Sequence, residues 1–200
     1  AVTSEPITSP TSDRLVAVDV TDGIAHVRLS RPDKLNALTL QTLRELVAVA
    51  RDLRTDRRLR AVVISGDGSS FCAGLDFPSV NKTPRKVATS FIPNPFRGTN
   101  HFQQSLWAWR RLPVPVIAIT RGHVFGAGIQ LALAADFRIA TPDSQWSVLE
   151  GRWGIIPDMS GVRSLAQLVG MDTAKLLTMT ARTVSGQEAS DLGLVTELAG

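Results

Sequence analysis

The sequence contains a single cysteine, Cys72, and no hydrophobic run long enough to cross a membrane. One cysteine excludes an internal disulfide bond, which is consistent with a reducing compartment. A membrane-spanning helix needs about 20 consecutive apolar residues, whereas Arg121 and Asp136 bracket the longest apolar stretch here. We therefore expect a cytoplasmic protein without a membrane partner.

The motifs of several common enzyme classes are also missing. The chain has no G-x-S-x-G nucleophile elbow, no phosphate-binding P-loop and no complete dinucleotide fingerprint. Its three histidines, His26, His101 and His123, are scattered without metal-ligand spacing, so we expect no metal. The net charge of +4 is modest, and no aromatic residues interleave with the arginines of residues 51–60. Nucleic-acid binding is therefore not expected.

The length and composition predict one domain with a short tail. The chain has 200 residues, of which 44% are hydrophobic, and this is enough to bury a sizeable core. Residues 1–12 are rich in Ser, Thr and Pro, and no hydrophobic run follows a basic start. We expect these residues to form a disordered tail rather than a signal peptide. The remaining residues, 13–200, are expected to form the core domain.

The hydrophobic pattern alternates between strand-like and helix-like segments. It predicts strands at 15–20, 24–29, 59–65, 114–120, 137–140 and 146–148. Residues 21–23 (TDG) between the first two strands indicate a hairpin. The pattern predicts helices at 39–53 (with Thr39 as the N-cap), 103–112, 129–136, 159–169 and 172–180. The segment 78–100 holds four prolines and is expected to be irregular and mobile. This alternation predicts an α/β layered domain with right-handed crossovers.

Two glycine-bearing turns follow two of the predicted strands. Residues 73–76 (AGLD) come after the strand at 59–65, and residues 126–128 (GAG) come after the strand at 114–120. In parallel sheets, ligands bind outside the carboxyl ends of the strands. If the two strands are neighbours, one free backbone N–H from each turn could stabilise a negatively charged oxygen.

These turns and the segments around them resemble the crotonase family, also called enoyl-CoA hydratase/isomerase. The resemblance runs from about residue 14 to the end, and the order and spacing of the motifs together make it specific. Family members usually continue with a further helical segment, which is expected to be short or missing here. The matching segments are Arg31-Pro32, 35–38 (LNAL), 71–76 (FCAGLD), 126–132 (GAGIQLA), Ala135-Asp136, Glu150, 154–157 (GIIP), 180–182 (TAR) and 193–195 (GLV).

The resemblance implies a fold, a ligand and an assembly. The fold would be a spiral of ββα units with two roughly perpendicular sheets, assembled as a homotrimer or a dimer of trimers. The ligand would be an acyl-CoA thioester, whose oxygen would accept hydrogen bonds from the amides of Leu75 and Ala127. Coenzyme A would arrive as part of the substrate, with no separate cofactor. The residues that would contact substrate or coenzyme A are Leu35, Asn36, Ala37, Ala73, Gly74, Asp76 and Gly126.

Glu150 matches the general acid/base of the family, which moves a proton beside the thioester carbonyl. Read without the resemblance, it would be a surface acid at the end of a strand. Gln130 stands where hydratases of the family carry a second glutamate. Glutamine can hold a water but cannot take a proton, which favours an isomerase with one base. The alternatives are a hydratase with a non-standard second polar residue, or an acyl-CoA-binding protein without activity. Gln130 could also simply fill a polar gap.

Asp158 lies eight residues after Glu150. Dienoyl-CoA isomerases of the family have an aspartate at the matching place, so Asp158 is a third catalytic candidate. An aspartate after a proline and before a helix is equally an N-cap. Cys72 is expected to be a buried small residue rather than a nucleophile. The pattern leaves open whether the tryptophans beside Glu150, Trp146 and Trp153, line an acyl pocket or belong to the core.

Overall fold

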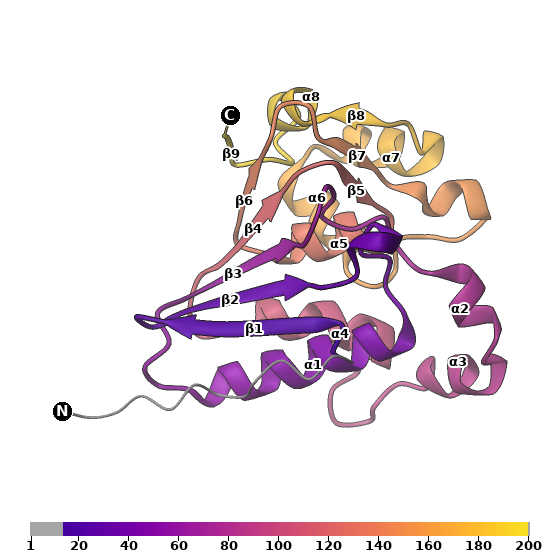
Figure 1. Ribbon diagram of the computed structural model, residues 1–200. Helices are drawn as coiled ribbons and strands as arrows, with labels where there is room; N and C mark the ends of the chain where they lie inside the picture. Colours follow the sequence, from indigo (N-terminus) through magenta and orange to yellow (C-terminus); the bar gives the residue numbers. More distant parts are fainter. Residues whose placement is uncertain (1–13, 200) are drawn as a thin grey trace.

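The computed structural model describes residues 14–199, which form two β-sheets and eight α-helices (Figure 1). The tail expected over residues 1–12 lies outside the described residues. The strands are β1 Val16–Thr21, β2 Ile24–Leu29, β3 Ala61–Gly66, β4 Val116–Thr120, β5 His123–Phe125, β6 Phe137–Ala140, β7 Gln145–Ser147, β8 Val184–Ser185 and β9 Glu197–Leu198. The helices are α1 Leu40–Thr55, α2 Phe77–Asn81, α3 Pro84–Ser90, α4 His101–Arg110, α5 Ala127–Ala134, α6 Gly161–Leu168, α7 Met171–Thr180 and α8 Gly186–Asp191, with 3₁₀ turns η1 Pro32–Lys34 and η2 Leu149–Trp153.

The larger sheet has the strand order β1-β2-β3-β4-β6-β9, and the smaller sheet has the order β5-β7-β8. The predicted hairpin is confirmed, because β1 and β2 pair antiparallel with Thr21 opposite Ile24. From β2 to β9 the pairs of the larger sheet are parallel. The strands β3 and β4, whose adjacency the sequence left open, pair directly, with Val62 opposite Val116. Their carboxyl ends therefore lie at the same edge of the sheet.

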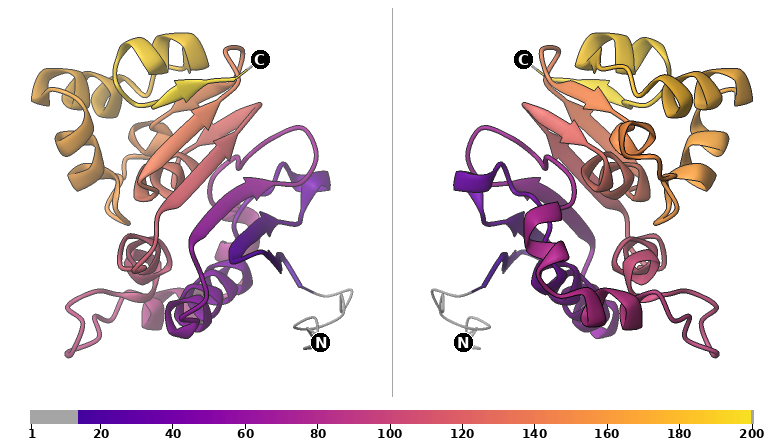
Figure 2. Two further views of the ribbon diagram at one scale, coloured as in Figure 1. Left: turned by 90° about the vertical axis from the view of Figure 1, so that its left-hand side faces the viewer. Right: turned by 90° about the vertical axis from the view of Figure 1, so that its right-hand side faces the viewer.

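The helices gather on one side of the larger sheet, where they cover the hydrophobic core (Figure 2). Alternate residues of β2 and β3 are buried, among them Val27 and Ile64. Helix α1 contributes the apolar face that includes Leu43 and Leu46, and it packs on α4. Thr39 caps α1 as predicted: its hydroxyl accepts a hydrogen bond from the amide of Thr42. This core holds the strand ends, and hence the two glycine turns, in fixed positions.

The expectation of an irregular segment over 78–100 is wrong in its first half, which forms α2 and α3. Proline fixes φ near the helical value and lacks only an N–H that the first helical turn leaves unused. Pro78 and Pro84 stand at such starting positions, so they begin helices here. Helix α4 also begins two residues earlier than predicted, because Asn100 and Gln103 form a capping box.

Candidate active site

The two glycine turns lie in contact at the carboxyl edge of the larger sheet. Gly74 has φ +101°, and a Cβ atom added there would lie 3.1 Å from the carbonyl oxygen of Phe125. Gly126 has φ +51°, and its added Cβ would lie 3.8 Å from the Cα of Gly74. Neither backbone conformation suits a residue with a side chain. The glycines therefore let the turns approach closely, at the place predicted from the strand order.

Among residues 14–199, the first turn presents the amide of Leu75 without a protein acceptor, and the second turn presents the amides of Ala127 and Gly128. Leu75 pairs with Leu38 in a parallel bridge, in which the neighbouring residues Gly74 and Asp76 make the hydrogen bonds to Leu38. Ala127 is the first residue of α5, and the amides of the first turn have no partner within a helix. Both residues line the same cavity.

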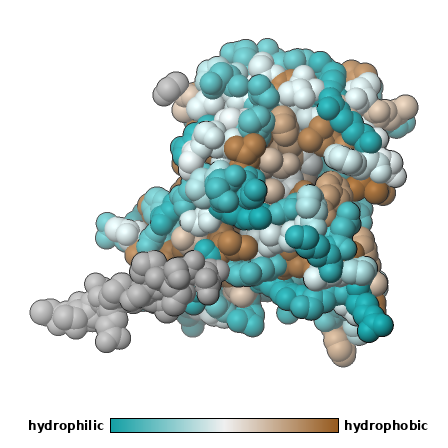
Figure 3. All heavy atoms as spheres, turned by 45° about the vertical axis from the view of Figure 1, so that its right-hand side comes forward, coloured by the Kyte–Doolittle hydropathy of each residue, from teal (hydrophilic) through white to brown (hydrophobic). Residues whose placement is uncertain are grey.

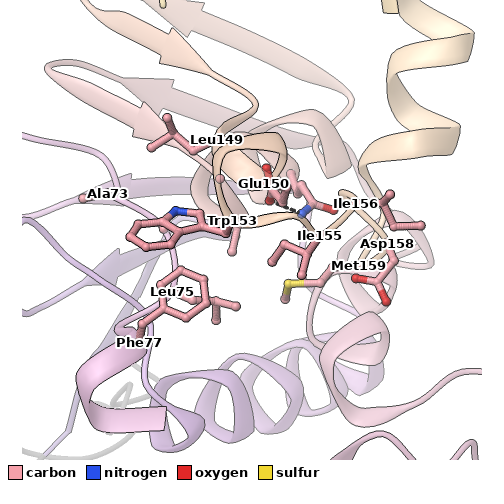
Figure 4. A pocket seen from close by; sticks show the side chains of 14 residues that line it. Ala73, Leu75, Phe77, Leu149, Glu150, Trp153, Ile155, Ile156, Asp158 and Met159 are labelled. Carbon is pink, nitrogen blue, oxygen red and sulfur yellow. Dashed lines mark hydrogen bonds between the residues drawn. The ribbon is translucent and has the colours of Figure 1, made fainter. Parts of the chain in front are cut away.

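The cavity has a volume of about 170 Å³ and a largely apolar wall. In Figure 4 the rings of Phe77 and Trp153 lie at one end of it, Asp158 lies at the other, and Glu150 lies between them. The two rings pack with their centroids 5.2 Å apart. The lining residues are Ala73, Gly74, Leu75, Phe77, Gly126, Ala127, Gln130, Leu149, Glu150, Trp153, Ile155, Ile156, Asp158 and Met159.

Glu150 is a buried carboxylate beside the second glycine turn. It belongs to η2 and is only 6% exposed, so the alternative of a surface acid at a strand end is wrong. A Cβ atom added at Gly126 would lie 3.6 Å from its Oε1. Gln130 donates a hydrogen bond of 2.6 Å from Nε2 to the same oxygen (Figure 4). Within the described residues, Oε2 is buried and has no hydrogen-bond partner.

Burial raises the pKa of Glu150, because a charged carboxylate loses its hydration there. Hydrogen bonds from its own backbone and from Gln130 act in the opposite direction, and the charge of Asp158 raises the pKa further. A carboxyl group with a raised pKa is suited to taking up and returning a proton near neutral pH.

Gln130 is 1% exposed and is held at both ends of its side chain. Its Oε1 accepts hydrogen bonds from the amides of Ser160, at 3.0 Å, and Gly161, at 2.8 Å, where α6 begins. Its Nε2 donates to Glu150. The structure thus brings the predicted pair Glu150 and Gln130 into direct contact.

Asp158 lines the cavity, and partial burial raises its pKa. The N-cap alternative for Asp158 is wrong, because α6 begins after Ser160 and has no side-chain cap. Sequence alone could not place this start, since both Asp158 and Ser160 are residue types that cap helices.

The two predicted coenzyme A segments lie side by side. Ala73 and Gly74 line the cavity, whereas the residues of the other segment do not. The amide of Ala73 bonds to the carbonyl of Leu35, and that of Leu38 bonds to Gly74. The side chain of Asn36 is buried, and its amide group donates to the carbonyls of Asp67 and Ser70. The side chain of Asn36 therefore holds its own loop against the loop that contains Asp67 and Ser70.

Leu35 and Ala37 flank Asn36 on the same loop, and neither belongs to the cavity lining. The carboxylate of Asp76 pairs with Arg31 at 2.6 Å and caps α2 through the amide of Ser79. Any contact of this loop with coenzyme A stays a prediction.

The remaining candidates are Cys72 and the two tryptophans near Glu150. Cys72 is fully buried, and burial raises the pKa of its thiol to about 12, which suits the predicted inert role. Trp146 belongs to the core, whereas Trp153 is 63% exposed and lines the cavity. The sequence analysis did not place Phe77, Ile155, Ile156 or Met159 at the site, although these four residues line the cavity. The apolar residues around Glu150 and after Asp76 are the signal that could have identified them.

Among residues 14–199, no group of histidine, cysteine or acidic side chains has the arrangement of a metal site. No helix in this range is long and apolar enough to span a membrane.

A family model for enoyl-CoA hydratase/isomerase matches residues 19–199. The chain is 32% identical over 187 residues to hydroxycinnamoyl-CoA hydratase-lyase of Pseudomonas fluorescens, covering 92% of this chain and 66% of that protein. It is 29% identical to a peroxisomal Δ(3,5)-Δ(2,4)-dienoyl-CoA isomerase of Arabidopsis thaliana, covering 93% of this chain and 69% of that protein.

Solved structures of enoyl-CoA hydratases are also similar to this chain. The crystal structure of an enoyl-CoA hydratase from Bacillus anthracis is similar with a TM-score of 0.82 and 30% identity, covering 93% of this chain and 70% of that chain. The crotonase-like α/β fold expected from the sequence is therefore confirmed. The chain spans about two thirds of the length of the curated relatives it matches. The chain belongs to the enoyl-CoA hydratase/isomerase family.

Proposed function

We propose that this chain binds an acyl-CoA thioester and moves a proton beside its carbonyl group, with Glu150 as the base, in an isomerase-type reaction. The observation that carries this proposal is the buried carboxylate of Glu150 next to two turns that each present a free amide. Coenzyme A enters as part of the substrate. A homotrimer or dimer of trimers, which the family resemblance supports, belongs to the same proposal. So does a cytoplasmic location, which the single cysteine supports.

The amides of Leu75 and Ala127 would bind the thioester oxygen. Loss of a proton from the neighbouring carbon puts negative charge on that oxygen, and preorganised N–H donors stabilise the charge as it forms. A single donor of this kind is typically worth about 10²–10³-fold in rate. Because both donors belong to the backbone, side-chain variation at these two positions leaves them in place.

Glu150 would carry the proton between two carbons of the acyl chain. Its carboxylate removes a proton from the carbon beside the carbonyl, and the C–H electron pair delocalises onto the thioester oxygen. The same carboxyl group then returns the proton to the carbon two positions further along a 3-enoyl chain. The electron pair forms the new C–H bond, and the double bond shifts into conjugation with the carbonyl. Neither water nor an oxidant is consumed.

Gln130 favours isomerisation over hydration. By the family resemblance, hydration uses two carboxylates to hold and activate a water. An amide cannot accept the proton of that water, and both ends of this amide are engaged by protein groups. Asp158 lines the same cavity and would take part if the substrate were a longer conjugated chain.

Turnover of 3-enoyl-, 2-enoyl- and dienoyl-CoA esters in deuterated water tests the proposal. We expect isomerisation with deuterium incorporation by the wild type, and a loss of about 10²–10⁴-fold in Glu150→Gln. Glu197→Gln, an exposed carboxylate on β9, serves as the control and should retain activity. Addition of water at a rate equal to isomerisation would favour the hydratase alternative. Thioester binding without turnover, unchanged in Glu150→Gln, would favour the non-catalytic alternative.

A further inference from the structure

The side-chain amide of Gln130 has only one orientation that satisfies its neighbours. Its Oε1 accepts from two backbone amides, those of Ser160 and Gly161, and these groups can only donate. The Nε2 end therefore faces Glu150 and donates to its Oε1. The reversed orientation would place Nε2 against two N–H groups and an oxygen against a carboxylate.

The anchor of this amide is tightly packed. The hydroxyl of Ser160 also donates to the backbone carbonyl of Gln130 at 3.0 Å. A Cβ atom added at Gly161 would lie 2.9 Å from Oε1 of Gln130 and 2.7 Å from Cβ of Pro157. A glycine at the start of α6 is therefore what leaves room for the side chain of Gln130.

We propose that Gln130 is a positioning residue, which uses the first amides of α6 as an anchor to hold the Glu150 carboxylate beside Gly126. This inference rests on the proposed function of Glu150 as the base. It gives Gln130 no direct part in the reaction, because its amide is occupied by protein groups at both ends.

One side-chain hydrogen bond, from Gln130, holds the carboxylate of Glu150 in place. Among residues 14–199, Nε2 of Gln130 is the side-chain donor to Glu150, whereas Oε2 of the carboxylate has no partner. If this donor were lost, the carboxylate could rotate away from Gly126. The ionised form would also become less favourable, because a donor to a carboxylate stabilises its charge.

The charged surroundings of Glu150 are few, so the effect of Gln130 can be isolated. Asp158 is the charged side chain whose field acts on Glu150. Helices α2 and α5 contain no charged residue. The charged residues of the other neighbouring elements are exposed: Arg152 of η2, Arg163 of α6, and Asp172 and Lys175 of α7.

Two variants test the proposal in different ways. Gln130→Glu keeps an acceptor for Ser160 and Gly161 but replaces the donor to Glu150 by a carboxylate oxygen. Gly161→Ala leaves Gln130 intact but displaces it by the contact with the added methyl group. Gln187→Glu is the matched control, because the exposed side chain of Gln187 on α8 also donates to a carboxylate, that of Asp191, at 3.0 Å.

The first measurement is the titration of the Glu150 carboxyl group by carbon-13 NMR, assigned by its absence in Glu150→Gln. In Gln130→Glu we expect the pKa of Glu150 to rise by roughly one unit or more, as for a carboxylate pair in contact. In the Gln187→Glu control it should not move. This readout needs no turnover, so it remains decisive if the proposed activity fails.

The second measurement is the pH profile of isomerisation. In Gln130→Glu the acid limb of kcat should move to higher pH, and in both test variants kcat should fall about tenfold or more while KM changes little. An unshifted Glu150 titration in folded Gln130→Glu would overturn the proposal. So would wild-type kcat in folded Gly161→Ala. Failure of Gln130→Glu to fold would contradict the proposed anchor, because a carboxylate accepts the same two N–H bonds.

Discussion

At the scale of single residues, the burial of Glu150 favours the proposed proton transfer but lowers the stability of the fold. Its carboxylate is buried, one of its oxygens has no partner, and its pKa is raised. Desolvation of a charged group costs free energy of folding, and functional sites commonly accept such costs. Glutamine at position 150 would keep an acceptor for Gln130 and remove the charge.

We therefore expect Glu150→Gln to lose activity and to gain stability in a pH-dependent way. The pKa of Glu150 is higher in the folded chain than in the unfolded chain, so the folded state binds more protons between those two values. The stability that the group contributes is fully present below its ordinary pKa. It is lost as the pH rises through the folded-state value.

Denaturant unfolding at several pH values checks this expectation. The free energy of unfolding of Glu150→Gln should exceed that of the wild type increasingly as the pH rises from the ordinary pKa of glutamate through the raised folded-state pKa of Glu150. Glu197→Gln, an exposed carboxylate, should follow the wild-type curve. Parallel stability curves for the wild type and Glu150→Gln would show that burial of the charge carries no such cost.

At the scale of elements, the site depends on the contact between two turns that follow neighbouring parallel strands. Gly74 allows this contact, because its φ of +101° and the 3.1 Å approach of Phe125 exclude a side chain. We expect Gly74→Ala to separate the amides of Leu75 and Ala127. It should lower kcat by about 10²-fold, the typical value of one oxyanion donor.

The same substitution should also destabilise the fold by roughly 1–3 kcal/mol through backbone strain. Gly98→Ala is the matched control, since Gly98 has φ +66° but no atom within 4 Å of an added Cβ. The control should show a strain cost without a loss of kcat. Equal kcat in the two variants, measured alongside their unfolding curves, would mean that contact between the turns is unimportant.

Elements were predictable from the sequence where a local signal was strong. The cap at Thr39 and the hairpin around Asp22 appear as predicted. The pairing of β3 with β4 was left open by the sequence, and the structure provides it. The strands β5, β8 and β9 have only two or three residues, too few for a periodic pattern. The prolines of residues 78–100 suggested irregular chain, although two of them start helices.

At the scale of the whole molecule, the sheet edge gathers chemistry from distant parts of the chain. The glycine turns could be predicted from residue types and spacing, whereas the role of Glu150 was an expectation from the family resemblance. The bond between Gln130 and Glu150 could not be predicted, since it depends on where α6 begins. The contact between Phe77 and Trp153 could not be predicted either, because these residues belong to elements that are far apart in sequence. On the face of the molecule drawn in Figure 3, hydrophobic and hydrophilic residues are intermixed.

The most direct measurement is a crystal structure of the protein with a 2-enoyl-CoA thioester bound. We expect the thioester oxygen to lie about 2.7–3.1 Å from the amide nitrogens of both Leu75 and Ala127. The Glu150 carboxylate should lie within about 3–3.5 Å of the carbon beside the carbonyl. A thioester oxygen bound away from both amides, or a Glu150 carboxylate turned away from that carbon, would contradict the proposed mechanism.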